Sequence, residues 1–316
     1  LHLAKIPRPI IQEHFKYINS SPLDGDHARQ YAWFKLGTPG LSITFMVRAT
    51  SPHAIESPKL LASPSIHRRI SGFPTDCYFF LTLYKMSLKY IDNARKILCI
   101  GRNYAAHIKE LNNTAPQQPF FFLKPSSSIL KPKAGPFLVP RGTIVHHEVE
   151  LAVILGKDLR NLPSDFSHEE ALSAIDGYAL SIDMTARNVQ DEAKKKGLPW
   201  SIGKGFDTFL PLSEFIPKEK IPDPYKVRLS LSVNGDAKQD DLTDLMIFPI
   251  HKILSHMSSI MTLEKGDLIL TGTPKGVGPV KAGDKITASL QVDELPLAEI
   301  KLDCVEKDGP YVYKET

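Results

Sequence analysis

The 316-residue chain is poor in cysteine and contains no long hydrophobic run. Its 3 cysteines, Cys77, Cys99 and Cys304, stand far apart and form no C-x-x-C spacing. This argues against a disulfide framework and against a cysteine-based zinc site, and it fits a reducing compartment. The longest apolar runs fall far short of the roughly 20 residues that span a bilayer, so we expect no membrane partner.

Common nucleotide-binding and hydrolase motifs are also missing. The sequence has no G-x-G-x-x-G and no G-x-S-x-G, so dinucleotide binding and a serine hydrolase elbow lack support. The stretch LTGTPKGVG (270–278) is a glycine-rich loop able to aim backbone N–H groups at an anion. It lacks the spacing and the Gly-Lys-Ser/Thr ending of a Walker A loop.

Excess basic charge is confined to the N-terminal part. Residues 1–85 hold 10 Lys/Arg and 5 Asp/Glu, out of 39 and 35 in the whole chain. The remainder is close to neutral and shows no basic face with interleaved aromatic residues, which argues against a nucleic-acid partner.

Residues 1–85 also differ in pattern from the rest of the chain. Proline and serine interrupt them, and the two candidate strands, SITFMV (42–47) and CYFFLTLY (77–84), are isolated. We expect a poorly structured segment, either a leader or sequence upstream of a functional start at Met86. The basic excess suits a mitochondrial presequence, although such sequences are usually shorter and poorer in acids.

Strands and short helices alternate from Lys96 onward. Ser167 and Glu170 form a capping box, Gly197 follows three lysines at a helix end, and Asn234-Gly235 predicts a hairpin turn. These patterns predict one mixed, β-rich α+β domain over residues 90–316. The predicted strands are 96–101, 119–125, 144–156, 177–183, 228–235, 267–274, 284–292 and 297–305, and the predicted helices are 103–111, 167–175, 185–197 and 248–261.

Two glutamates interrupt the predicted strand IVHHEVELAVILG (144–156). Glu148 and Glu150 share a strand face with His146, with Cα atoms about 7 Å apart. The strand continues into five apolar residues, 151–155, without alternation, which is typical of the protein interior. A buried glutamate pair needs a cationic partner, whereas a half-exposed strand whose polar face meets water would not.

A third acid, Asp183, ends the predicted strand 177–183. It could cap the following helix, although Thr185 is an alternative cap. Together with Glu148 and Glu150 it would supply three oxygen ligands and no sulfur. Such a set selects a hard cation, namely Mg²⁺, or else Mn²⁺ or Ca²⁺.

His107 and Glu110 are three residues apart on the predicted helix 103–111 and so share one face. A carboxylate can orient an imidazole and raise its basicity, which suits a general base. The alternative is an ordinary solvated helix face. Lys124 and Lys204 are single lysines in apolar or glycine-flanked surroundings.

Five motifs occur in one order along the chain: GRNYAAH, FFLKP, HHEVEL, DMTARNVQDEAKKKGLPW and LILTGTPKGVG. Through them, residues 90–316 resemble the fumarylacetoacetate hydrolase superfamily, in particular its mitochondrial branch of acylpyruvate hydrolases, oxaloacetate decarboxylases and oxaloacetate tautomerases. The resemblance implies a mixed β-sandwich or β-roll with short peripheral helices, a homodimer, and a mitochondrial location with the cytosol as alternative. Residues 1–85 fall outside it.

The resemblance also implies roles for individual residues. Glu148, Glu150 and Asp183 would bind Mg²⁺, His107 and Glu110 would form a catalytic dyad, and Lys204 would stabilise an enolate. Substrate contacts would come from Lys124, Arg187, Gln190 and Thr273.

The substrate implied is a small enolisable 2-oxo acid that chelates Mg²⁺. We expect oxaloacetate keto–enol tautomerisation, ahead of acylpyruvate hydrolysis or oxaloacetate decarboxylation, on branch resemblance alone. A non-catalytic metal- and dicarboxylate-binding relative is the alternative from another class. The presence of His107, Glu110 and Lys204 beside the three acids argues against it.

Overall fold

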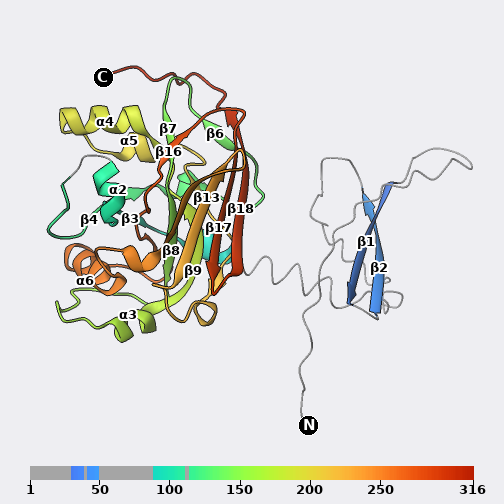
Figure 1. The fold of residues 1–316 in the computed structure, drawn as a ribbon, viewed down its shortest axis with the longest axis horizontal. Coiled ribbons are helices and arrows are strands. Elements are labelled where there is room, and N and C mark those ends of the chain that lie inside the picture. Colours follow the sequence, from blue (N-terminus) through green and yellow to red (C-terminus); the bar gives the residue numbers. More distant parts are fainter. Residues whose placement is uncertain (1–29, 39–40, 50–87, 111–113) are drawn as a thin grey trace, which may run out of the picture. The chain divides into compact units, whose positions relative to one another are not determined.

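The computed structural model describes residues 30–38, 41–49, 88–110 and 114–316, and the chain divides into two units, Leu1–Phe73 and Pro74–Thr316. In the first unit, β1 (Gln30–Thr38) pairs antiparallel with β2 (Leu41–Ala49) (Figure 1). The predicted strand 42–47 lies within β2, but it is not isolated, and β1 is not among the predicted elements. The predicted strand 77–84 lies outside the described residues, and the poorly structured state of 1–85 stays a prediction.

Two large sheets make up most of the second unit. The first has six strands in the order β12-β9-β8-β15-β3-β4, and the second has five in the order β14-β13-β17-β18-β6. Strands β3 and β15 are parallel and the other pairs of the six-stranded sheet are antiparallel. The strands are β3 (Ile97–Gly101), β4 (Phe120–Lys124), β6 (Phe137–Val139), β8 (Val149–Leu155), β9 (Ile175–Ile182), β12 (Ile216–Pro217), β13 (Val227–Val233), β14 (Asp236–Leu242), β15 (Leu268–Leu270), β17 (Lys285–Val292) and β18 (Leu295–Glu306).

Smaller sheets and helices accompany these two sheets, and the labelled helices lie on the side away from β17 and β18 (Figure 1). The smaller sheets contain β5 (Ile129–Leu130) with β11 (Leu210–Pro211), and β10 (Thr185–Ala186), β7 (Val145–His147) and β16 (Gly278–Val280). Residues 88–93 are helical. The other helices are α2 (Ala105–Glu110), α3 (His168–Ala174), α4 (Arg187–Lys196), α5 (Ser201–Lys204), α6 (Ile250–Ile260), and the 3₁₀ turns η1 (Ser126–Ser128), η2 (Lys218–Lys220) and η3 (Thr243–Leu245). None of the helices in the described part of the chain is long and apolar enough to cross a membrane.

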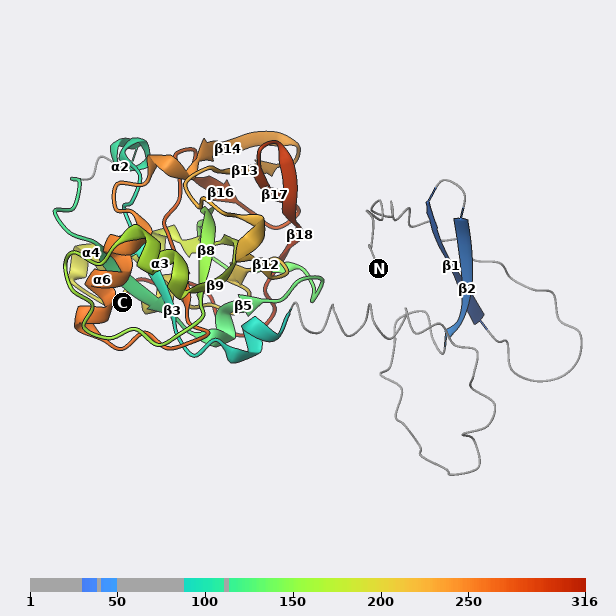
Figure 2. The same cartoon turned by 90° about the horizontal axis from the view of Figure 1, so that it is seen from below.

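The two large sheets pack face to face, with β8 and β9 against β13, β17 and β18 (Figure 2). Leu151 and Leu180 from one sheet join Leu229 and Ala288 from the other in a common apolar core. The opposite face of the six-stranded sheet is covered as well, by a second apolar cluster that includes Ile154. Burial of β8 on both faces explains the unbroken apolar run 151–155. The predicted mixed β-sandwich with peripheral helices is confirmed.

The predicted strand 144–156 is not continuous. It breaks at Glu148 into β7 and β8, which belong to different sheets. The neighbouring strand breaks at the same level, since β9 ends at Ile182 and β10 begins at Thr185. The backbone N–H of Asp183 donates to the carbonyl of Glu148 across 2.8 Å, and so joins the two breaks. The chain therefore passes from one sheet to another at Glu148 and again at Asp183.

The helix ends follow the sequence, with one correction. Ser167 and Glu170 form the predicted capping box, and Gly197 ends α4 in the left-handed conformation. The residue before α4, however, is Ala186, and no side chain caps this helix. Neither Asp183 nor Thr185 is therefore the cap. Asn234 and Gly235 have φ values of 54° and 89° in the predicted hairpin turn between β13 and β14.

Candidate active site

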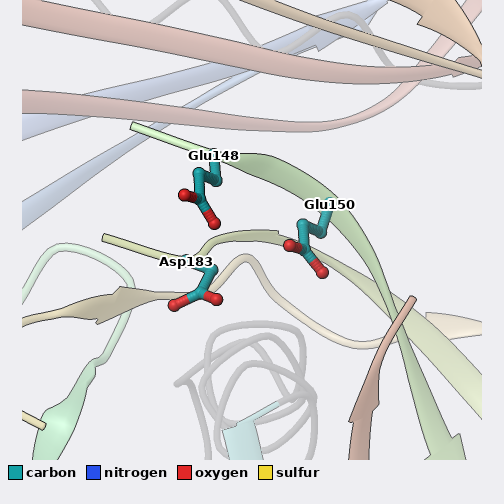
Figure 3. Close-up of side chains that lie close together, drawn as sticks. All are labelled: Glu148, Glu150 and Asp183. Carbon is teal, nitrogen blue, oxygen red and sulfur yellow. The ribbon is translucent and has the colours of Figure 1, made fainter. Parts of the chain in front are cut away.

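Three carboxylates meet where the strands break (Figure 3). Glu148 lies between β7 and β8, Glu150 lies on β8, and Asp183 follows β9. One oxygen of each lies within 4.8 Å of the others. All three residues are buried, with exposed fractions of 7%, 2% and 1%. The sequence-based prediction that these acids converge is confirmed, but the break in the strands produces the geometry.

Lys204, the last residue of α5, supplies positive charge to two of these acids. Its Nζ donates to Glu148 Oε2 at 2.9 Å and to Asp183 Oδ2 at 2.7 Å. Burial by itself would lower the pKa of Lys204, but the two carboxylates outweigh burial and the pKa is raised. Lys204 is therefore held as a cation beside the acids.

Lys124, on β4, approaches Asp183 from another direction. Its Nζ donates to Asp183 Oδ1 at 2.7 Å and to the carbonyl of Met184 at 3.2 Å. Burial lowers its pKa by more than the contact with Asp183 raises it. The side chain is 3% exposed, and its amino group faces Asp183.

Arg187 and Gln190, both on α4, complete the surroundings of Glu148. Arg187 Nη2 donates to Glu148 Oε1 at 2.5 Å, and Nη1 donates to Gln190 Oε1 at 2.6 Å. Burial would raise the pKa of Glu148, but Lys204 and Arg187 hold it well below its usual range. Glu148 is therefore an anion in the folded chain.

Glu150 has no cationic partner among the described side chains. One oxygen accepts a hydrogen bond from the backbone N–H of Gly272 at 2.7 Å. Burial, together with the neighbouring charges of Asp183 and Glu148, holds its pKa well above the usual range. A buried carboxylate without a counter-charge is costly. A divalent cation among the three acids would supply that charge, and an all-oxygen donor set fits a hard ion.

Gln239 supports this region and was not predicted from the sequence. Its Nε2 donates to Thr273 Oγ1 at 2.8 Å, and Thr273 Oγ1 donates to the carbonyl of Val149 at 2.8 Å. Gln239 Oε1 accepts the N–H of Val149 and contacts His147 Nδ1, at 3.0 and 2.9 Å. Gln239 is the one buried residue of the mostly exposed strand β14. A lone buried glutamine has no signature in the sequence.

The predicted pair on α2 is present. His107 Nδ1 lies 3.4 Å from Glu110 Oε2, and His107 is 5% exposed. Both oxygens of Glu110 also accept the backbone N–H of Gly276, at 2.9 and 3.1 Å. His107 is thus buried beneath a partly exposed carboxylate, which a solvated helix face would not explain.

A small pocket opens from these side chains to the surface. Three aromatic side chains, two further cations, Ile100 and Gly101 form the rest of its wall. The site residues predicted from the sequence that line it are His107, Glu148, Glu150, Asp183, Arg187, Gln190, Lys204 and Thr273. Lys124 and Glu110 contact lining residues but do not line the pocket themselves.

Comparison with known proteins assigns the chain to a family. Residues 96–301 match the family model described as the C-terminal domain of fumarylacetoacetate hydrolase. A mitochondrial oxaloacetate tautomerase of Saccharomyces cerevisiae is 49% identical over 261 residues, which covers 73% of this chain and 100% of the relative. The chain belongs to the fumarylacetoacetate hydrolase family.

Other members of the fumarylacetoacetate hydrolase family differ in the reaction for which they are named. A mitochondrial oxaloacetate decarboxylase of Dictyostelium discoideum is 50% identical over 203 residues, which covers 64% of this chain and 91% of the relative.

Solved structures of the family share the fold. The crystal structure of a yeast member is 48% identical, with a TM-score of 0.66 over 72% of this chain and 99% of the other. A fumarylpyruvate hydrolase from Pseudomonas aeruginosa, crystallised with Mn²⁺ and pyruvate, is 32% identical, with a TM-score of 0.60 over 68% and 91% of the two chains.

Proposed function

We propose that this family member is a divalent-metal-dependent enzyme that interconverts the keto and enol forms of oxaloacetate. The observation that carries the proposal is the buried cluster of Glu148, Glu150 and Asp183, in which Glu150 lacks a cationic partner among the described residues. The cluster lies in a pocket with Lys204 and His107. The names of the relatives support the substrate.

Glu148, Glu150 and Asp183 would hold the ion, which we propose is Mg²⁺. When bound, it supplies Lewis-acid stabilisation of negative charge on the substrate's oxygens. Lys204 brings a second positive charge to the same place, where it stabilises the enolate that forms when C3 loses a proton. Because Glu148 and Asp183 fix its amino group, little reorganisation is needed as charge develops.

His107 would move the proton at C3 of the substrate. Glu110 contacts Nδ1 of the ring, which leaves the other ring nitrogen for the substrate. The substrate's carboxylate would be bound by Arg187 and Gln190, which already contact each other, with Thr273 on the same pocket wall. Lys124 would not contact the substrate directly but would hold Asp183 in place through its hydrogen bond to Oδ1.

Oxaloacetate decarboxylation is the second candidate, and the name of the Dictyostelium relative favours it. Tautomerisation forms the enolate of oxaloacetate by loss of a C3 proton, and decarboxylation forms the enolate of pyruvate by loss of CO₂. Because both enolates place negative charge on the C2 oxygen, one site can serve both reactions. In acylpyruvate hydrolysis, an activated water would instead attack the C4 acyl group. A catalytically silent relative would bind metal and dicarboxylate without turnover.

The test is a turnover assay with enol-oxaloacetate and acetylpyruvate, in Mg²⁺ and after chelation. We expect rapid, Mg²⁺-dependent loss of the enol absorbance of oxaloacetate, faster than CO₂ release or acetylpyruvate cleavage. Mn²⁺ or Ca²⁺ in place of Mg²⁺ identifies the ion preference. Equal rates with and without metal would contradict the metal-dependent mechanism, and faster cleavage of acetylpyruvate would favour the hydrolase.

We further propose that residues 90–316 form the catalytic domain, that the enzyme is a homodimer, and that it resides in mitochondria. The family match over 96–301 supports the domain, and the relatives' names support the location. Light scattering at several protein concentrations tests the dimer, and cell fractionation tests the location. A monomer at all concentrations, or a purely cytosolic protein, would contradict these proposals.

A further inference from the structure

The pocket contains a cation that no described carboxylate neutralises. Four cationic side chains line it. Lys204 and Arg187 contact Glu148, and Lys194 pairs with Asp191 at 3.1 Å. The fourth, Arg102, forms no ion pair with the acidic residues of the described chain.

The backbone holds Arg102 in an unusual conformation. Its φ of 59° lies in the left-handed region, which non-glycine residues rarely adopt. The next residue, Asn103, is buried and anchored by three hydrogen bonds: Nδ2 donates to the carbonyls of Thr271 and Phe248 at 2.8 and 3.1 Å, and Oδ1 accepts the N–H of Phe248 at 2.7 Å. Such strain persists where the surrounding structure imposes it, and it is concentrated at ligand sites.

An aromatic ring supports the guanidinium. Arg102 Cζ lies 5.6 Å from the centre of the Phe120 ring, and Trp200 meets the same ring edge-on at 5.6 Å. Gly101 makes this packing possible, because a Cβ there would lie 2.2 Å from the ring. A guanidinium stacked on an aromatic face keeps its planar fork of N–H donors free, and that fork matches a carboxylate.

We propose that Arg102 binds the second carboxylate of a four-carbon 2-oxo dicarboxylate. This inference rests on the proposed function, in which the 2-oxo acid end of the substrate occupies the carboxylate cluster. The other end of a dicarboxylate then needs a counter-charge within the same pocket, and Arg102 is the one that no protein acid neutralises among the described residues. An acylpyruvate carries a neutral group at that end and gains nothing from Arg102. The arginine therefore selects dicarboxylates over monocarboxylates.

Binding of two non-reacting ligands tests this directly. Malate and 2-hydroxybutyrate share the 2-hydroxy acid end, but malate has a second carboxylate where 2-hydroxybutyrate has a methyl group. In calorimetry with the full chain in Mg²⁺, we expect the wild type to prefer malate. Arg102→Gln should weaken malate binding by about 10–100-fold, the range for a charge-assisted hydrogen-bonded pair. The affinity for 2-hydroxybutyrate should stay unchanged.

Two further variants separate charge from structure. Arg102→Lys keeps the charge and should retain part of the malate preference. Arg160→Gln removes the same charge from an exposed arginine outside the pocket, and it should change the affinity for neither ligand. Three results would overturn the inference. In Arg102→Gln, they are an equal loss of affinity for both ligands, or unchanged malate binding. In the wild type, it is the absence of a preference for malate.

The same experiment is independent of turnover. A wild type that prefers malate through Arg102 but does not tautomerise oxaloacetate would support the dicarboxylate site and refute the proposed reaction. Normal tautomerisation with no dependence of ligand preference on Arg102 would refute this inference alone.

Discussion

Asp183 and Glu150 face the same space but have opposite electrostatic surroundings. Lys124 and Lys204 both contact Asp183, whereas Glu150 receives one backbone hydrogen bond and the repulsion of its neighbours. Without a metal ion, Asp183 therefore stabilises the fold and Glu150 destabilises it. With the ion bound, both would act as ligands.

Substitution of these two acids should separate metal binding from stability. Excess Mg²⁺ should stabilise the wild type, by about 2.7 kcal/mol at 100 times Kd, and should stabilise neither Glu150→Gln nor Asp183→Asn. In chelator, Asp183→Asn should unfold about 3–5 kcal/mol more easily, because two buried lysines lose their partner. Glu150→Gln should be no less stable than the wild type. Denaturant unfolding measures each value, and Mg²⁺ stabilisation of Asp183→Asn would remove it from the ligand set.

Replacement of His107 tests the proposed base. His107→Ala should lower kcat for oxaloacetate tautomerisation by about 10²–10⁴-fold, the range for loss of general acid–base catalysis, and leave Mg²⁺ affinity unchanged. Glu110→Gln should lower kcat by a smaller factor, because the amide oxygen of glutamine can still accept a hydrogen bond from the backbone N–H of Gly276. Lys109→Ala, an exposed position on the same helix, is the control. Full activity in His107→Ala would remove His107 from the mechanism.

At the scale of elements, α4 is anchored at its outer side by the last residues of the chain. Arg187 and Gln190 line the pocket, while Glu192 accepts hydrogen bonds from Thr316 N at 2.7 Å, Lys196 Nζ at 2.9 Å and Tyr313 Oη at 3.0 Å. The hydrogen bonds from Thr316 and Lys196 lower the pKa of Glu192 from 4.5 to about 2. Residues 313–316 therefore fasten the helix that carries two proposed substrate contacts.

This anchor should depend on pH. Because the folded pKa of Glu192 is lowered, its contribution to stability is present above pH 4.5 and is lost as the pH falls toward about 2. Glu192→Gln should therefore unfold at lower denaturant than the wild type at pH 7, and the difference should shrink at pH 3. Glu315→Gln, an exposed neighbour, is the control. A difference that is constant between pH 7 and pH 3 would show that the carboxylate charge does not stabilise the anchor.

At the scale of the whole molecule, the proposed chemistry belongs to one unit. The family match covers residues 96–301, and every pocket residue lies in the unit Pro74–Thr316. The β1–β2 pair lies in the other unit, Leu1–Phe73. The unit Pro74–Thr316 has its own two-sheet core, and we expect it to fold by itself.

A chain that begins at Met86 should fold and turn over oxaloacetate with the kcat and KM of the full chain, because it contains the complete core and site. Thermal unfolding and the enol-oxaloacetate assay, run side by side with residues 1–316, measure both. Loss of solubility or activity in the shorter chain would show that residues 1–85 contribute to the folded enzyme.

Local patterns in the sequence determined the elements and the identity of the key acids. Most strands and helices were predictable because side-chain periodicity, the Ser167–Glu170 capping box and the Asn234-Gly235 turn act over a few residues. Glu148, Glu150 and Asp183 were identifiable because acids inside apolar strands require a partner. The pairing of His107 with Glu110 came from their spacing and from resemblance, the role of Lys204 came from resemblance alone, and all three roles stay predictions.

Only the tertiary structure decided how these residues meet. The break at Glu148 depends on pairing with β9 and β10, and the backbone N–H of Val149 is satisfied by Gln239, 90 residues away. Tertiary contacts also determine the hydrogen bond of Lys124 to Asp183 and the packing of the Arg102 guanidinium against the Phe120 ring. Each depends on contacts between distant segments, and these form only when buried polar groups find partners in the packed chain.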